Sequence, residues 1–389
     1  MSRTVRIPIT GPVLEWARKE SGLSRAELAF KLNVAPIDVE SWETETTQPT
    51  KTQFKKLTAT LRRPSAIFFL DTPPPAGAFK ASFRRASEAT GLINPDELKP
   101  LRDARRYQAV AEWILAELDE SQQSPLPVVF DPRSASPQLV ADKVRTTLAV
   151  SFNEQLAFPD AAKSLKAWRA AAEERLGMFV FQMQFPNEAK YTRGFCLPSD
   201  TAPIVVLNSA FTEPARIFTL FHECAHLILR DAILCDVWST RNTKSEHERW
   251  AESFAANVLL PQVPFRQLLR QIVRNEELNT EHVRIAARRT KCSVRAVALR
   301  CIEIGAANWD LYEQVVKETK DVDFKPPAKP GGGERAAQRK LREIGPRLPV
   351  ALFRARDEDI IGHYDVLRHL DMSNEQTKEL ESSIASGVV

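Results

Sequence analysis

The sequence lacks paired cysteines, long apolar runs and an export signal, and each absence argues against a class of protein. The five cysteines are odd in number, widely spaced and without any CxxC pair, which argues against a disulfide framework and a cysteine zinc site. No segment reaches about 18 consecutive apolar residues, and the first residues lack an apolar core. We therefore expect a cytoplasmic protein with no membrane partner.

The chain also lacks a large charge of either sign. Its 54 basic and 50 acidic residues give a formal net charge of +4, too small an excess to indicate a nucleic-acid partner without a local basic patch. Hydrophobic content of 43% and charged content of 27% are ordinary for a soluble globular protein. At 389 residues and about 150 residues per domain, two or three domains are expected.

The pattern along the chain predicts a mainly α fold with a small β-sheet. Four short helices are predicted in residues 1–70, and the second of them begins with a capping box formed by Ser24 and Glu27. The proline-rich stretch 71–79 marks a domain boundary, and 71–135 reads as a linker with one connecting helix. An α+β domain is predicted for 136–275, followed by a helical extension over 276–389.

The predicted elements follow the usual periodicities. Helices are expected at 12–21, 24–32, 35–42, 50–63, 97–122, 138–149, 160–176, 212–230, 245–260, 262–274, 279–290 and 293–304. Segments 177–186, 192–198 and 203–208 are rich in β-formers and predict a small mixed or antiparallel sheet. The stretch 326–333 reads as a linker, and the tail beyond it as one basic and one acidic helix.

His222, Glu223 and His226 form the pattern H-E-x-x-H within a predicted helix. Residues four apart lie on one face of a helix, so both imidazoles can reach a single ion, which suits a tetrahedral zinc. The neighbouring residues are apolar on nearly every side, which predicts that the helix is buried. Because buried polar groups without partners are costly, a metal is favoured over three surface polar residues.

A catalytic zinc usually has three protein ligands, and the predicted helix 245–260 offers candidates for the third. Its apolar stripe includes Ala251 and Ala255, and both Glu248 and Glu252 lie on that stripe, whereas Glu246 points toward solvent. Glu248 is favoured as the ligand. Glu252 is either a carboxylate that orients a ligand histidine, the alternative ligand, or a half-exposed helix residue.

These residues resemble the ImmA/IrrE family of zinc metallopeptidases. RGFCLP, PIVVLNS, RIFTLFHECAHLIL and E-x-x-A-E-x-FAANVLLP follow the family's order over roughly residues 138–275. The chain departs from the family at Glu252, where Asn or Asp is usual. The resemblance implies that 136–275 has a zincin-like fold. It also implies a zinc metallo-endopeptidase in which a metal-activated water attacks a peptide carbonyl and Glu223 acts as the base. Strand 203–208 either pairs with an extended substrate or is a core strand.

The N-terminal residues resemble an XRE-type helix-turn-helix, with 24–32 as its first helix and 35–43 as its recognition helix. Residues 34–47 contain no Lys or Arg and four acids, which a DNA backbone would repel. DNA binding and protein docking or dimerisation are therefore weighted equally. The candidate DNA contacts are Arg3, Arg6, Ser41, Thr44, Lys51, Lys55 and Lys56.

The sequence favours a cytoplasmic zinc peptidase fused to a helix-turn-helix domain. The resemblance suggests that it regulates transcription by cleaving a protein substrate such as a repressor. The alternative is a non-catalytic DNA-binding regulator or antitoxin-like protein that uses the peptidase fold as a sensor. The intact H-E-x-x-H with Glu223 favours the enzyme.

Overall fold

The computed structural model describes twelve stretches of the chain, and they divide into two compact units. The described residues are 6–21, 23–61, 65–70, 72–73, 82–85, 98–120, 124–129, 131–185, 192–230, 246–274, 276–319 and 334–386. Unit 1 comprises Met1–Phe79 and Leu92–Lys99, and unit 2 comprises Lys80–Gly91 and Pro100–Val389. Most of the predicted boundary 71–79, and all of the predicted linker 326–333, lie outside the described residues.

The elements of unit 1 among its described residues are all helical, and they include the predicted helix-turn-helix. They are α1 (Gly11–Glu20), α2 (Arg25–Leu32), α3 (Pro36–Glu43), α4 (Lys51–Leu61) and a 3-10 turn, η1 (Ser65–Phe69). The predicted capping box is present, because Ser24 Oγ accepts from Glu27 N and Glu27 Oε2 accepts from Ser24 N. Asn33 ends α2 in the left-handed conformation, which turns the chain toward α3.

The core of unit 1 is apolar with one enclosed ion pair at its edge. Leu14, Trp42 and Phe68 are among the buried side chains that hold the helices together. Arg18 of α1 contacts Glu43 at the end of α3, with Nε 2.5 Å from Oε1. Both side chains are at least nine-tenths buried, so this pair joins the first and third helices inside the unit.

Unit 2 is built on a mixed four-stranded sheet. Its strands are β1 (Ser82–Arg85), β2 (Phe179–Met183), β3 (Thr192–Leu197) and β4 (Ile204–Asn208), in the order β1-β3-β4-β2. β1 and β4 each pair antiparallel with β3, whereas β2 and β4 are parallel. β4 is therefore paired on both sides. The idea that it offers a free edge to a substrate was wrong, because both rows of its backbone groups are already used.

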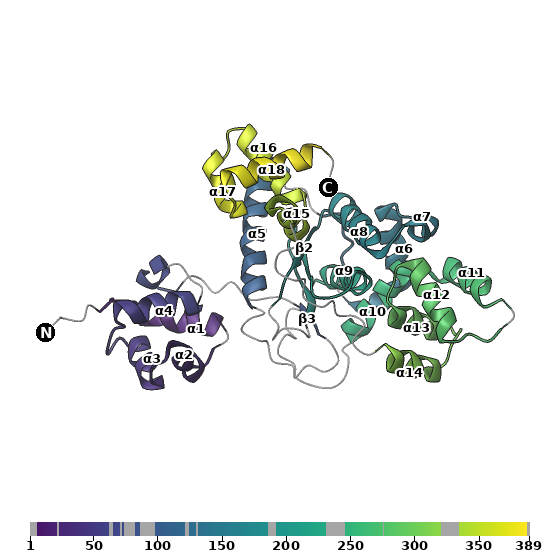
Figure 1. Cartoon of the computed structure of the whole chain (residues 1–389), viewed down its shortest axis with the longest axis horizontal. Helices are drawn as coiled ribbons and strands as arrows, with labels where there is room; N and C mark the ends of the chain where they lie inside the picture. The colour runs from purple at the N-terminus through teal and green to yellow at the C-terminus, as the bar shows by residue number, and fades with distance from the viewer. Residues whose placement is uncertain are drawn as a thin grey trace. The chain divides into compact units, whose positions relative to one another are not determined.

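The helices that surround the sheet hold a long buried helix against it (Figure 1). That helix is α9 (Glu213–Ile228), which packs on β3 and β4 and is covered by α8 (Ala161–Arg175) and α10 (Glu246–Leu259). α10 also packs on α6 (Pro137–Leu148). The connecting elements are α5 (Leu98–Glu117), η2 (Pro132–Ser134) and a short α7 (Phe152–Ala157).

The second half of unit 2 is entirely helical among the described residues. It comprises α11 (Gln262–Val273), α12 (Thr280–Thr290), α13 (Val294–Glu303), α14 (Trp309–Glu318), α15 (Ala336–Ile344), α16 (Arg347–Asp357), α17 (His363–Leu370) and α18 (Asn374–Ala385). The expectation of only two helices in the tail was wrong, since α15 to α18 all follow the predicted linker. The fold class is otherwise as predicted: mainly α, with a small sheet, a helix-turn-helix unit and a helical extension.

Candidate metal centre

Helix α9 is enclosed throughout, so it places its polar residues inside the protein. Every residue from Ala215 to Ile228 is buried. Trp168 of α8 packs edge-on against Phe221 with ring centroids 5.1 Å apart. The apolar pattern that predicted a buried helix is therefore confirmed.

A glycine in β3 sets how closely α9 approaches the sheet. A Cβ added to Gly194 would lie 2.5 Å from the Val206 carbonyl oxygen and 2.8 Å from Cγ2 of Thr219. Only a residue without a side chain fits between β4 and α9 at this point. Sequence reasoning missed this role, although a glycine inside a predicted strand was the available signal.

Helix α10 is held in place by contacts on either side of Glu248. Trp250 Nε1 donates to the Ala135 carbonyl at 2.8 Å, and its ring stacks on Phe254. Arg300 Nη2 donates to Asn257 Oδ1 at 2.6 Å, which ties the end of α10 to α13. The side chain of Glu248 is thus presented from a fixed helix toward α9.

The three predicted metal ligands, His222, His226 and Glu248, bring their ligand atoms together. His222 Nε2 and His226 Nε2 lie 3.0 Å apart, and each lies 3.3 Å from a carboxylate oxygen of Glu248. Among the described residues, this is the group of histidine, cysteine and acidic side chains whose ligand atoms all lie within 4.8 Å of one another. A tetrahedral zinc with bonds of 2.0–2.1 Å would separate its ligand atoms by about 3.3 Å. The donor set and spacing therefore fit zinc.

The electrostatics of the cluster favour an ionised carboxylate. Partial burial alone would raise the pKa of Glu248, but hydrogen bonds and charge from His222 and His226 together hold that pKa well below its usual value. Two imidazoles and a carboxylate are the ligand types that divalent zinc takes in catalytic sites.

The remaining candidates of this region occupy different positions. Glu223 is fully buried on α9, one residue after the first histidine. Glu252 is half-buried one turn after Glu248 on α10 and does not belong to the converging group. Cys224 is fully buried, and burial raises the pKa of its thiol from 9.0 to about 12, so it remains a protonated apolar residue.

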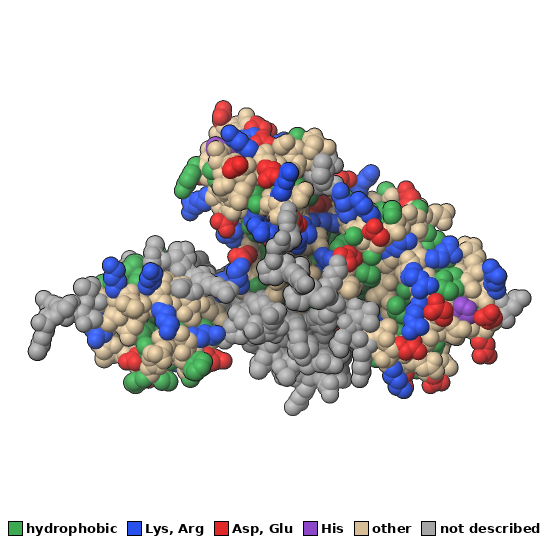
Figure 2. All heavy atoms as spheres, viewed as in Figure 1, with side chains coloured by type: hydrophobic (Ala, Val, Ile, Leu, Met, Phe, Trp, Pro, Cys, Tyr) green, Lys and Arg blue, Asp and Glu red, His purple; other side chains and the backbone are tan. Residues whose placement is uncertain are grey.

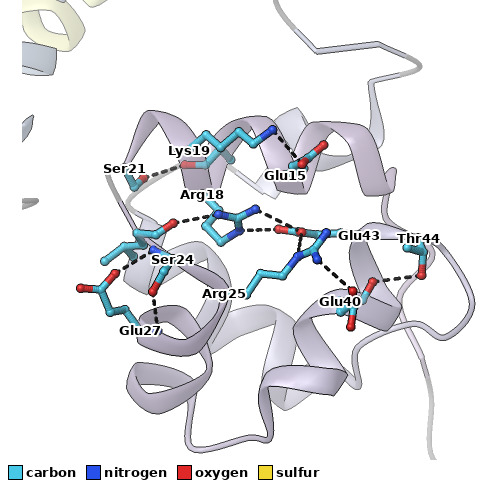
Figure 3. A network of polar contacts seen from close by, with 12 residues as sticks. Glu15, Arg18, Lys19, Ser21, Ser24, Arg25, Glu27, Glu40, Glu43 and Thr44 are labelled. Atoms are coloured by element: carbon cyan, nitrogen blue, oxygen red, sulfur yellow. Dashed lines mark hydrogen bonds and ion pairs between the residues drawn. The ribbon is translucent and has the colours of Figure 1, made fainter. Parts of the chain in front are cut away.

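The structure gives the four acids of residues 34–47 internal partners, and Figure 3 shows those of Glu40 and Glu43. Glu43 binds both Arg18 and Arg25, and Glu40 binds Arg25 Nη1 at 2.9 Å. Asp38 Oδ2 accepts from Ala35 N, and Glu45 Oε1 accepts from Gly11 N. These acids therefore stabilise the unit, which the sequence pattern alone did not indicate.

The predicted DNA contacts are spread over unit 1. Ser41 Oγ donates to the Asp38 carbonyl, and Thr44 Oγ1 donates to the Glu40 carbonyl, so both hydroxyls are used within α3. Arg6 Nη1 donates to the Gln48 carbonyl. Lys51, Lys55 and Lys56 are exposed on α4, where Lys56 Nζ donates to the Leu32 carbonyl, and Arg3 lies outside the described residues.

Comparison with known proteins finds a family model that matches the middle of the chain. Residues 173–301 match the model of the IrrE N-terminal-like domain, Peptidase_M78. The matched segment contains the H-E-x-x-H helix and α10, so the resemblance found in the sequence is confirmed there. A search of curated proteins found no match.

Two solved structures show weak similarity. A crystal structure of Bacillus thuringiensis PlcR in complex with the peptide PapR7 and DNA is 12% identical, with 80% of this chain and 93% of that chain covered and a TM-score of 0.16. A crystal structure of ComR from Streptococcus suis is 9% identical, with 98% and 96% covered and a TM-score of 0.15. TM-scores this low support no statement about the present chain.

In the part of the chain that the structure describes, no helix is long and apolar enough to cross a membrane.

Proposed function

We propose that unit 2 is a zinc-dependent endopeptidase whose metal is held by His222, His226 and Glu248. The observation that carries this proposal is the convergence of their ligand atoms within 4.8 Å between α9 and α10. Three protein ligands leave a fourth position for water, as in catalytic rather than structural zinc sites. When bound, zinc supplies Lewis-acid chemistry that polarises a carbonyl and acidifies water.

Glu223 performs the proton transfers in this proposal. It follows His222 directly on α9 and lies in a fully buried environment that excludes bulk water. Its carboxylate takes a proton from the attacking water and delivers it to the amine that leaves when the peptide bond breaks. Glu252, one turn after Glu248, orients a ligand histidine in this scheme or replaces Glu248 as the ligand.

The proposed substrate is a cytoplasmic regulatory protein such as a transcriptional repressor. The helix-turn-helix of unit 1 brings the chain to that partner, to DNA or to a second copy. Transcriptional regulation without catalysis is the second candidate function. It is favoured by the ion pairs of Glu40 and Glu43 with Arg18 and Arg25, because these pairs lower the charge penalty for approaching DNA.

Metal content tests the ligand assignment first. We expect about one zinc per chain in the purified protein and its loss in His222→Ala and Glu248→Ala, because three ligands are needed. Glu223→Gln should retain zinc, and Glu252→Gln should weaken zinc binding by roughly 10–100-fold if it orients a ligand. Elemental analysis with competing chelators measures both. Zinc lost in Glu252→Gln but kept in Glu248→Ala would reverse the two roles.

Cleavage is tested by comparing cells that produce the wild type or Glu223→Gln. Mass spectrometry of protein N-termini should reveal new termini with the wild type, and loss of the base should reduce their formation by roughly 10²–10⁴-fold. Equal zinc content of the two proteins is the control. An unchanged set of termini together with an unchanged regulatory phenotype would favour the non-catalytic regulator.

A further inference from the structure

A second site is suggested by a cavity of about 1170 Å³ in unit 2. It lies between α8, β2 and the first turn of α9 on one side and α15 and α16 on the other. The two sides are in direct contact, because Arg169 Nη1 of α8 donates to the Arg342 carbonyl of α15 at 2.8 Å. The volume is large enough for a small organic molecule.

Basic side chains outnumber acidic ones in the lining of this cavity. The four acids are Glu120, Glu173, Glu174 and Glu213, and the six bases are Lys166, Arg169, Arg216, Arg342, Arg347 and Arg354. Lys and Arg side chains are visible on this face of unit 2 near the C-terminal helices (Figure 2). The lining therefore carries a positive excess even when every acid is ionised.

Arg347 contributes a charge that its hydrogen bonds do not balance. Its Nη1 donates to the carbonyl oxygens of Glu173 and Met178 at 2.8 and 3.2 Å, and its guanidinium lies over the ring of Phe179. These partners are neutral. Burial lowers the pKa of Arg347, and the charges of Glu173 and Glu120 oppose that shift only in part. A bound anion would stabilise the charged guanidinium further.

Two further guanidinium groups each have one donor nitrogen for which the described residues supply no acceptor. Arg169 and Arg216 are 7% and 6% exposed, and Nη2 of Arg169 and Nε of Arg216 have no hydrogen-bond partner among the described residues. A buried donor without an acceptor is unfavourable. A small shift of either side chain that lets it donate to a ligand oxygen would therefore stabilise the complex.

The backbone adds to the positive potential. Arg216 lies in the first turn of α9, and Arg347 is the first residue of α16, so two helix N-termini border the cavity. Neither Thr212 nor Pro346, their N-cap residues, provides a side-chain cap. Helix N-termini carry partial positive charge and favour anions.

Most of the uncharged lining is apolar and would contact the other half of the ligand. It includes Leu115, Pro125, Leu165, Leu341 and Val350. We propose that this cavity binds a small organic anion, in which an apolar body fills the space between α8 and α16 and the acidic group faces the arginines. The site contains none of the metal-centre residues and is independent of the proposed peptidase activity.

The test uses two fluorescent probes that share the same apolar ring system. 1-Anilinonaphthalene-8-sulfonate carries an anionic group, and N-phenyl-1-naphthylamine lacks it. With the full chain, we expect one saturable site that prefers the anionic probe by roughly tenfold or more, because the charge would be desolvated beside arginines. Arg347→Gln should remove most of that preference while the neutral probe binds as before.

Two further variants control for folding and for general charge. Arg342→Gln changes an exposed residue of the same lining, whose guanidinium also pairs with Glu334, and should also weaken the anionic probe by about tenfold. Arg339→Gln makes the same charge change on α15 at an exposed position outside the lining and should bind like the wild type. Circular dichroism verifies the fold of each variant.

The outcomes separate clearly. Equal affinity for the two probes, or the same loss in Arg339→Gln as in Arg342→Gln, would overturn the proposal, and so would the absence of saturable binding. A preference for the anionic probe that depends on Arg342 and Arg347 but not on Arg339 would establish the site.

Discussion

Arg18 and Glu43 are charged residues that lie buried, which the sequence did not indicate. In unit 1 they form a nearly enclosed pair, and Glu43 also accepts from Arg25 Nε at 2.7 Å. Glu43 of α3 thus holds α1, α2 and α3 together through its ion pairs. What remains exposed around it includes Phe30 at 87% and Ile37 at 65%, large apolar side chains that suit a protein partner as well as DNA.

Removal of Glu43 should be far more damaging than removal of an exposed acid in the same unit. Glu43→Ala leaves the buried charge of Arg18 without its main partner, so we expect destabilisation of roughly 3–5 kcal/mol. Glu15→Ala is the control, because Glu15 pairs with Lys19 in solvent and such pairs contribute about 0–1 kcal/mol. Urea unfolding of residues 1–79 or of the full chain measures both. Similar losses in the two variants would contradict the assigned role.

At the level of residues, the sequence indicated which side chains form the candidate metal centre. It did not indicate which ion pairs the charged residues of unit 1 form. The spacing of His222 and His226 followed from helical geometry, and the apolar stripe of α10 favoured Glu248, which converges with the two histidines. The pairing of Arg25 with Glu40 and Glu43 was not predictable, because it depends on the angle at which α2 crosses α3. No periodicity within one helix contains that angle.

At the level of elements, strong periodicity predicted long elements, and weak local signals failed for short ones. α9 and α10 were found close to their observed limits. β1 was missed because four residues, two of them arginines, show no alternating apolar pattern. α7 was also missed, although Ser151 and Glu154 form a capping box that would have indicated its start. The double pairing of β4 could not be read from its own residues.

The contact of β3 with α9 gives a prediction at this scale. Gly194→Ala would place a methyl group within 2.5 Å of the Val206 carbonyl and 2.8 Å of Thr219, so the sheet and helix must separate. We expect destabilisation of about 1–3 kcal/mol and weaker zinc binding, since α9 carries both histidines.

Thermal unfolding and a zinc titration by competition measure these two effects. Gly194→Ser should be at least as damaging as Gly194→Ala, because it adds a further atom in the same place. Unchanged stability in both variants would show that β3 and α9 are not in close contact.

At the level of the whole molecule, each unit has its own apolar core, and the two cores share no residue. Unit 1 and unit 2 should therefore unfold in separate thermal transitions. Zinc should raise the transition temperature of unit 2 only. At a free zinc concentration 100 times Kd, the free energy of unfolding of unit 2 should increase by roughly 2.7 kcal/mol.

Differential scanning calorimetry with and without zinc measures this effect. In His222→Ala neither transition should respond to zinc. A single transition that shifts as a whole would show that the units unfold together.

The position of helix α9, which borders both the cavity and the candidate metal centre, has a consequence for the binding of their ligands. Its first turn borders the cavity through Arg216, and His222 follows six residues later, about 9 Å along the same helix. The affinities of zinc and of an anion that contact the same helix are thermodynamically linked. Whatever factor an anion in the cavity imposes on zinc affinity, zinc must impose on the anion in return. A zinc titration at two anion concentrations would therefore also measure how strongly the metal state controls the occupancy of the cavity.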